Sequence, residues 1–90
     1  MALIQKAIEE KIRKYIYSTF IYDPKIKFSN SDSLTKSGYV DSIGIMEFID
    51  FLSKTFEIAI PDSELKPENL DTINGSVNLV LKLKGNNEKD

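Results

Sequence analysis

The residue with the clearest chemical potential in this chain is Ser42, which lies between Asp41 and an apolar run in the segment SGYVDSIGIMEFIDFL, residues 37–52. A serine becomes a nucleophile when a base removes its proton, and histidine is the usual base. The 90 residues contain no histidine and no cysteine. This excludes a Ser-His-Asp relay, a thiolate nucleophile, a disulfide and the usual kind of zinc site. We therefore expect neither an enzyme nor a metal site.

Two interpretations of Ser42 follow from its place at the start of a helical pattern. In the first, Asp41 or Ser42 caps the helix, an interaction worth about 1 kcal/mol. A capping box would also need Glu or Gln three residues on, where the sequence has Gly44 and Ile45. In the second, the unpaired N–H groups and positive dipole end of the helix stabilise a phosphate. Ser42 would then accept a phosphate-linked group from another enzyme, which supplies the base and the metal.

Apolar periodicity predicts the first helix and the loop that follows it. Apolar residues recur at three- and four-residue steps from Ile4 to Phe20, and the helix ends before Asp23-Pro24 because proline disfavours the α conformation in the residue before it. Residues 23–40 are rich in turn formers and make an unusually long connection. Its apolar residues are candidate anchors to the core: Phe28, Leu34, Tyr39 and Val40.

The second helix is expected from Ser42 to Phe56 and has two distinct faces. Its core face collects Ile45, Phe48, Ile49, Leu52 and Phe56. The opposite face holds Ile43, Glu47, Asp50 and Lys54, with Met46 at the border. Ile43 and Phe51 are apolar residues off the core face, so both are predicted to be exposed.

The C-terminal third is predicted to hold one short and one long helix. A short helical turn is expected between Pro61 and Pro67, with Pro67 ending it. The last helix covers about 72–83, with Asp71 or Thr72 as its N-cap. No strand alternation is present, so the sequence predicts a single all-α domain.

The charges are unevenly distributed. Residues 37–71 carry two basic and eight acidic side chains, a balance of −6, whereas residues 1–36 balance at +3. Such an acidic block is either a solvated face or a surface that attracts basic proteins, and it repels nucleic acid. No apolar run approaches the roughly 20 residues that span a bilayer. The charged N-terminal segment does not resemble a secretory signal. We expect a soluble, cytoplasmic monomer without membrane insertion.

The segment GYVDSIGIMEFIDFLSKTFEIAIPD, residues 38–62, resembles the 4′-phosphopantetheine attachment region of acyl and peptidyl carrier proteins. The family signature is matched, after Gly38, at Asp41-Ser42-Ile43, Glu47, Phe56 and Ile60-Pro61-Asp62. The resemblance covers residues 3–84. It implies a four-helix bundle like that of acyl carrier proteins, with three long helices, one short helix and a long loop between the first two. The carrier domain would occupy 1–84 and a disordered tail 85–90.

The resemblance also implies roles for individual residues. Ser42 would carry 4′-phosphopantetheine from coenzyme A in a phosphodiester, attached by a phosphopantetheinyl transferase with support from Asp41. Partner enzymes would contact a surface made of Ile43, Met46, Glu47 and Asp50. The absence of cysteine would leave the thiol of the arm as the only one on the protein.

The resemblance is greatest to discrete carriers paired with adenylate-forming ligases. Gly44, Ser53 and Lys54 stand where fatty-acid carriers usually have acidic residues, and Gly44 with IPDSELKPENLDTI is similar to D-alanyl and aminoacyl carriers. Such a carrier would bear acyl or aminoacyl thioesters and deliver them to an acyltransferase or a condensing enzyme. The alternative is an unmodified helical interaction module that keeps the carrier fold.

Overall fold

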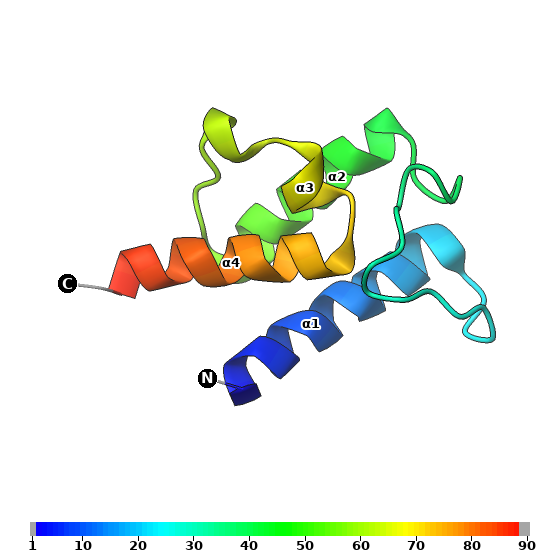
Figure 1. Ribbon diagram of the computed structural model, residues 1–90, viewed down its shortest axis with the longest axis horizontal. Coiled ribbons are helices and arrows are strands. Elements are labelled where there is room, and N and C mark those ends of the chain that lie inside the picture. Colours follow the sequence, from blue (N-terminus) through cyan, green and yellow to red (C-terminus); the bar gives the residue numbers. More distant parts are fainter. Residues whose placement is uncertain (1, 89–90) are drawn as a thin grey trace.

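The computed structural model describes residues 2–88, which form an all-helical bundle without strands (Figure 1). Its helices are α1 (Ala2–Ile16), α2 (Ser42–Phe56), α3 (Pro67–Leu70) and α4 (Ile73–Glu88). α1 and α4 lie side by side and run in opposite directions, so the first turn of α1 and the last turn of α4 share one end of the molecule (Figure 1). The predicted fold class, with three long helices, one short helix and a long first loop, is confirmed.

α1 continues into a π-helical turn, Tyr17–Ile21, before the chain leaves the helix. The turn ends at Tyr22, whose φ of 70° places it in the left-handed region and whose N–H donates to the carbonyl oxygen of Tyr17 at 2.7 Å. The helical segment therefore ends just before Asp23-Pro24, as predicted. The sequence did not predict the wider π-helical geometry of the last turn.

The loop between Tyr22 and Asp41 is held down by the predicted apolar anchors. Leu34 is completely buried, Phe28 is 4% exposed and Val40 is 3% exposed. Tyr39 is partly buried and meets the Phe28 ring edge-on, with 6.1 Å between ring centroids. Burial of apolar side chains stabilises a connection that would otherwise be mobile. The loop is thus part of the core, and all four anchors are confirmed.

Asp71, at the junction of α3 and α4, binds the same loop through polar contacts. Its carboxylate accepts hydrogen bonds from the hydroxyl of Ser33 at 2.5 Å and from the N–H and hydroxyl of Thr35 at 2.9 Å each. Its carbonyl oxygen accepts the N–H of Leu34 at 2.7 Å. Partial burial disfavours the charged form, but these hydrogen bonds together outweigh it and lower the pKa of Asp71 below its ordinary value.

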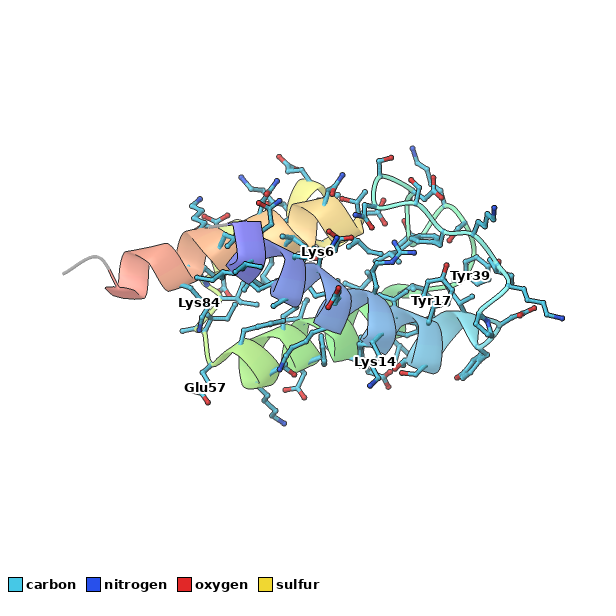
Figure 2. The ribbon with its side chains drawn as sticks, turned by 90° about the horizontal axis from the view of Figure 1, so that it is seen from below. Lys6, Lys14, Tyr17, Tyr39, Glu57 and Lys84 are labelled. Carbon is cyan, nitrogen blue, oxygen red and sulfur yellow. The ribbon has the colours of Figure 1, made fainter. Side chains whose placement is uncertain are left out.

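Tyr17 and Arg13 bind the opposite end of the loop. The Tyr17 hydroxyl, labelled in Figure 2, donates to the carbonyl oxygen of Ile26 at 2.6 Å and accepts the N–H of Phe28 at 3.0 Å. The Arg13 guanidinium donates to the side-chain oxygen of Asn30 at 2.6 Å and to the carbonyl oxygen of Phe28 at 2.9 Å. These contacts provide hydrogen-bond partners for backbone N–H and carbonyl groups of the loop, which are not paired within a helix.

The core is formed by one cluster of side chains from all four helices and the loop. α2 contributes Phe48 and Leu52, which are completely buried, and Phe56. Ile45 and Ile49, predicted on the same face, are only half-buried. Phe51 was predicted to lie exposed off the core face, and this is wrong: it is half-buried and packs against the core. The reason is that α1 brings a ring over it, as described below.

The C-terminal ends of α2 and α4 meet at one end of the molecule. The Lys84 ammonium donates to the carbonyl oxygen of Phe56 at 3.0 Å, beside Glu57, which ends α2 with a φ of 55° (Figure 2). A cation at this position is favourable because helix C-termini have unpaired carbonyl groups and a partial negative charge.

The segment between α2 and α4 differs in detail from the prediction. A 3₁₀ turn spans Asp62–Glu64, but Pro67 begins α3 rather than ending a turn. Proline fits the first helical position because the N–H that it lacks would have no partner there. Thr72 provides the cap of α4, since its hydroxyl accepts the N–H of Gly75 at 2.9 Å.

α4 is longer than the pattern predicted. It continues to Glu88, past the expected end at Leu83. Residues 89–90 of the predicted C-terminal tail lie outside the described residues. None of the described helices is both long enough and apolar enough to cross a membrane.

Candidate functional site

The first turn of α2 presents Ser42 and Asp41 at the surface. Asp41 has an extended backbone and is the N-cap: its carboxylate oxygen Oδ1 accepts the N–H of Gly44 at 2.8 Å. Ser42 is the first residue of α2, and its side chain is exposed. Of the two capping candidates, Asp41 is therefore the cap. This assignment gives Asp41 a structural role. Capping does not account for the exposed serine, Ser42, that follows it.

Gly44 holds the start of α2 close to the rest of the bundle. It is buried, and a Cβ atom at this position would lie 2.9 Å from Cγ1 of Val40 and 3.0 Å from Cε1 of Phe20. The side chain would therefore push α2 away from the end of α1 and from the loop. The sequence indicated only that Gly44 is typical of a carrier subtype, and the structure adds a packing reason for it.

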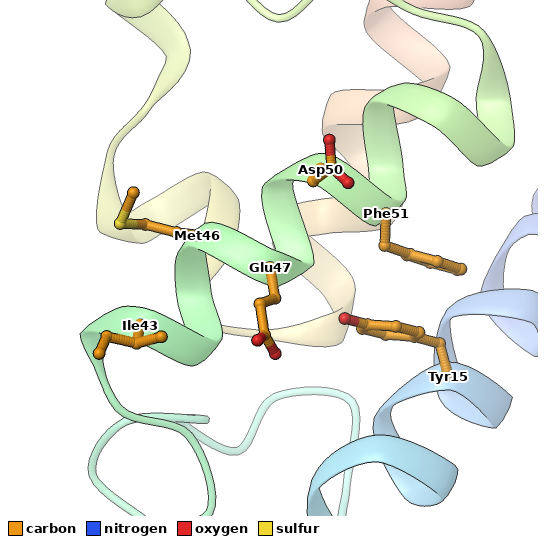
Figure 3. Close-up of a pocket in the computed structure, with 6 residues that line it drawn as sticks. All are labelled: Tyr15, Ile43, Met46, Glu47, Asp50 and Phe51. Atoms are coloured by element: carbon orange, nitrogen blue, oxygen red, sulfur yellow. The ribbon is translucent and has the colours of Figure 1, made fainter.

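The four residues predicted to contact partners lie together on α2. Ile43 and Met46 are 67% and 68% exposed, and they are neighbours at a three-residue spacing on the surface of α2. Glu47 and Asp50 are exposed beside them. All four line an open depression of about 460 Å³ between α1 and α2, called the α1–α2 depression below (Figure 3).

Two residues that were not predicted as site residues also line the α1–α2 depression. Tyr15 of α1 and Phe51 of α2 stack face to face, with 3.9 Å between ring centroids and 10° between ring planes. Burial, and then the nearby charge of Glu47, raise the pKa of the Tyr15 hydroxyl. The sequence contained one sign of this arrangement, which was the apolar Phe51 off the core face of its helix.

A second depression, called the α2–α3 depression, lies on the other side of α2. It has a volume of about 540 Å³ and is bounded by α2, α3 and the loop. Its apolar lining is formed by Ile45, Ile49, Leu65, Pro67 and Leu70. The half-burial of Ile45 and Ile49 follows from this, because both side chains face a groove instead of closed core.

Comparison with known proteins decides the family. The family model described as "Phosphopantetheine attachment site" matches residues 10–80, which include the second half of α1, the long loop and the whole of α2. The chain belongs to this family. It is therefore a carrier protein with a phosphopantetheine attachment domain, and carriers of this family are not themselves enzymes.

Two curated relatives are similar over most of their length. A probable acyl carrier protein, PigG, of Serratia sp. (strain ATCC 39006) is 29% identical over 82 residues, covering 91% of this carrier and 94% of the relative. A D-alanyl carrier protein of Streptococcus uberis (strain ATCC BAA-854 / 0140J) is 34% identical over 76 residues, covering 84% of this carrier and 94% of the relative. The resemblance recognised in the sequence is confirmed.

Proposed function

We propose that Ser42 is the attachment residue of this carrier, and that the protein bears acyl or aminoacyl intermediates as thioesters on a 4′-phosphopantetheine arm. The observation that carries the proposal is that Asp41 caps α2 while Ser42 is exposed on its first turn. A phosphodiester there fits the site, because the first N–H groups of a 15-residue helix and its positive dipole end favour a phosphate.

Asp41 has a second role in this proposal. Its hydrogen bond to the Gly44 N–H fixes the carboxylate next to Ser42. A carboxylate held there can help to position the metal-bound coenzyme A donor that a phosphopantetheinyl transferase brings to the serine. The base also comes from the transferase, which accounts for a chain without histidine. When attached, the arm supplies the thiol on which the cargo is carried.

The cargo and the loading enzyme are inferred from two features. One relative is a D-alanyl carrier protein and the other a probable acyl carrier protein, so both aminoacyl and acyl cargo are consistent with the family. Lys54, which pairs with Asp50 at 3.1 Å, makes the end of α2 less acidic. We infer loading by an adenylate-forming ligase and delivery to an acyltransferase or condensing enzyme in a specialised pathway. An apolar cargo can lie in the α2–α3 depression.

The partner surface proposed for these enzymes consists of Ile43, Met46, Glu47 and Asp50. Two exposed apolar side chains ringed by carboxylates suit a basic partner with an apolar centre. The carrier domain is proposed to span residues 1–84. A cytoplasmic location and a monomeric state stay predictions.

The test is the intact mass of the protein after incubation with coenzyme A, Mg²⁺ and a broad-specificity phosphopantetheinyl transferase. We expect one phosphopantetheine adduct on the wild type and on Ser31→Ala, an exposed loop serine used as the matched control. Ser42→Ala should stay unmodified. An adduct on Ser42→Ala would assign attachment to another residue. No adduct on the wild type with several transferases would favour the alternative, an unmodified interaction module.

A further inference from the structure

The α2–α3 depression is an apolar groove whose walls come from distant parts of the chain. α3 packs mainly on α4, so the facing sides of α2 and α3 stay apart (Figure 1). On the α2 side, Ile45 and Ile49 are half-buried. On the α3 side, Leu65 is 41% exposed. Apolar side chains that are open to water gain free energy when an apolar group covers them, so the groove is suited to an aliphatic occupant.

The groove lies close to Ser42. Ile45 follows Ser42 by less than one helical turn, and Ile49 follows it by almost two turns, so both lie on the same side of α2 as the serine. A cargo on a flexible arm attached to Ser42 therefore has the groove within reach.

Two lysines border the groove from different walls. Lys36 belongs to the first loop and Lys66 directly precedes α3, and both are exposed. Neither has an ion-pair partner among residues 3–85. Lys66 is moreover one of two basic side chains in the acidic segment 37–71. The groove thus combines an apolar lining with two ammonium groups that no carboxylate of the described chain pairs.

The nearby carboxylates are engaged in other contacts. Asp71, the one carboxylate that lines the groove, accepts three hydrogen bonds from the first loop. Glu64 accepts the ammonium of Lys82 at 2.6 Å and the side-chain N–H of Asn69 at 2.9 Å. The other acidic residues of this segment are exposed but do not line the groove: Asp62 and Glu68. The lining therefore holds two cations and a single carboxylate whose oxygens are already hydrogen-bonded.

We infer that the α2–α3 depression selects an aliphatic acyl cargo whose far end carries a carboxylate, and that Lys36 and Lys66 bind this carboxylate. A lysine ammonium is a compact charge on a flexible stem, so both lysines can meet an end group at the mouth of the groove while they stay hydrated. A cargo that ends in a cation would be repelled there. The inference rests on the proposed function and names the class of cargo.

The test is an NMR titration of the full-length, unmodified protein with three N-acetylcysteamine thioesters. Their acyl chains are of equal length and end in a methyl group, a carboxylate or a trimethylammonium group. We expect the carboxylate probe to bind about fivefold more tightly than the methyl probe, because it adds two exposed ion pairs. It should shift the methyl resonances of Ile45, Ile49 and Leu65. The trimethylammonium probe should bind most weakly.

Lysine variants separate charge from apolar packing. Lys36→Met and Lys66→Met each keep an apolar stem and remove the ammonium group, so each should reduce the preference for the carboxylate probe about twofold. The double variant should bind the carboxylate and methyl probes alike. Lys25→Met, which removes an equal charge from an exposed loop position outside the groove, should behave as the wild type does.

The inference would be overturned if the three probes bind alike or not at all, if the carboxylate preference survives in the double variant, or if the shifts map to the α1–α2 depression. The probes bind without covalent attachment, and the same samples are assayed for phosphopantetheine on Ser42, so the two proposals can fail separately. Normal modification without carboxylate preference refutes only the selectivity of the groove. Carboxylate preference without modification supports the groove and refutes the carrier role of Ser42.

Discussion

Replacing Gly75 by alanine tests the packing of α3 on α4. Gly75 is the third residue of α4, and helix propensity alone predicts that alanine there would stabilise the helix by up to about 1 kcal/mol. The structure predicts the reverse. A Cβ atom at Gly75 would lie far closer than 3.0 Å to the carbonyl oxygen of Glu68 in α3, with the carbonyl carbon at 3.2 Å and Oγ1 of Thr72 at 3.1 Å.

The size of the destabilisation depends on which atom the new Cβ would contact. Overpacking costs about 1–3 kcal/mol, and the upper end applies here because a backbone carbonyl cannot turn aside as a side chain can. Subtracting the gain of about 1 kcal/mol from propensity leaves a net destabilisation of about 2 kcal/mol. For a domain of this size, that lowers Tm by roughly 8–16 °C.

The assay is urea denaturation followed by circular dichroism, together with a thermal melt. Gly85→Ala is the matched control: Gly85 is exposed in the same helix, and a Cβ atom there would meet nothing within 4 Å. We expect its free energy of unfolding to be unchanged or slightly higher. If Gly75→Ala were as stable as the wild type, the close approach of α3 to α4 would be refuted.

Two more substitutions test other contacts. Asp71→Asn should lower the free energy of unfolding by about 1 kcal/mol at pH 7. Because the pKa of Asp71 is lowered in the folded state, the stability it contributes is present above the usual aspartate value of about 4 and is lost as pH falls through the lower folded value. The difference in urea midpoint between variant and wild type should therefore be smaller at pH 3 than at pH 7, and an equal difference at both would contradict the ionic contribution. Gly44→Ala should cost about 1 kcal/mol and slow phosphopantetheine transfer, because the new Cβ atom displaces the start of α2. Transfer kinetics measured beside Gly85→Ala would check this, and a wild-type rate would show that the displacement does not reach Ser42.

Local patterns were sufficient to predict the helices and the exposed start of α2. The bounds Ser42–Phe56 coincide with α2, because a polar cap and a 3.6-residue period define a helix without help from the rest of the fold. The buried loop anchors were also predictable, since apolar residues in a polar loop have few other places to go. The family signature lies in this same local segment.

The features that depend on how helices cross were not predictable. The half-burial of Phe51 arises because α1 places Tyr15 over it. An apolar residue off the core face was a sign of an additional contact, but the sequence does not show which element supplies that contact. The requirements for Gly44 and Gly75 arise from atoms of Val40, Phe20 and Glu68, which only the folded chain brings near. The role of Pro67 as a helix start depends on where the preceding 3₁₀ turn ends.

The contacts between the first loop and the α3–α4 junction have a consequence for local unfolding. The N–H of Leu34 donates to Asp71, and the N–H of Asn74 donates to the carbonyl oxygen of Asn30 at 2.9 Å. These amides can exchange with solvent only when the loop and the junction separate, although three of the four residues lie outside any helix. The loop and the junction thus form one cooperative unit in hydrogen exchange, and the start of α2 is attached to that unit directly through the buried Val40.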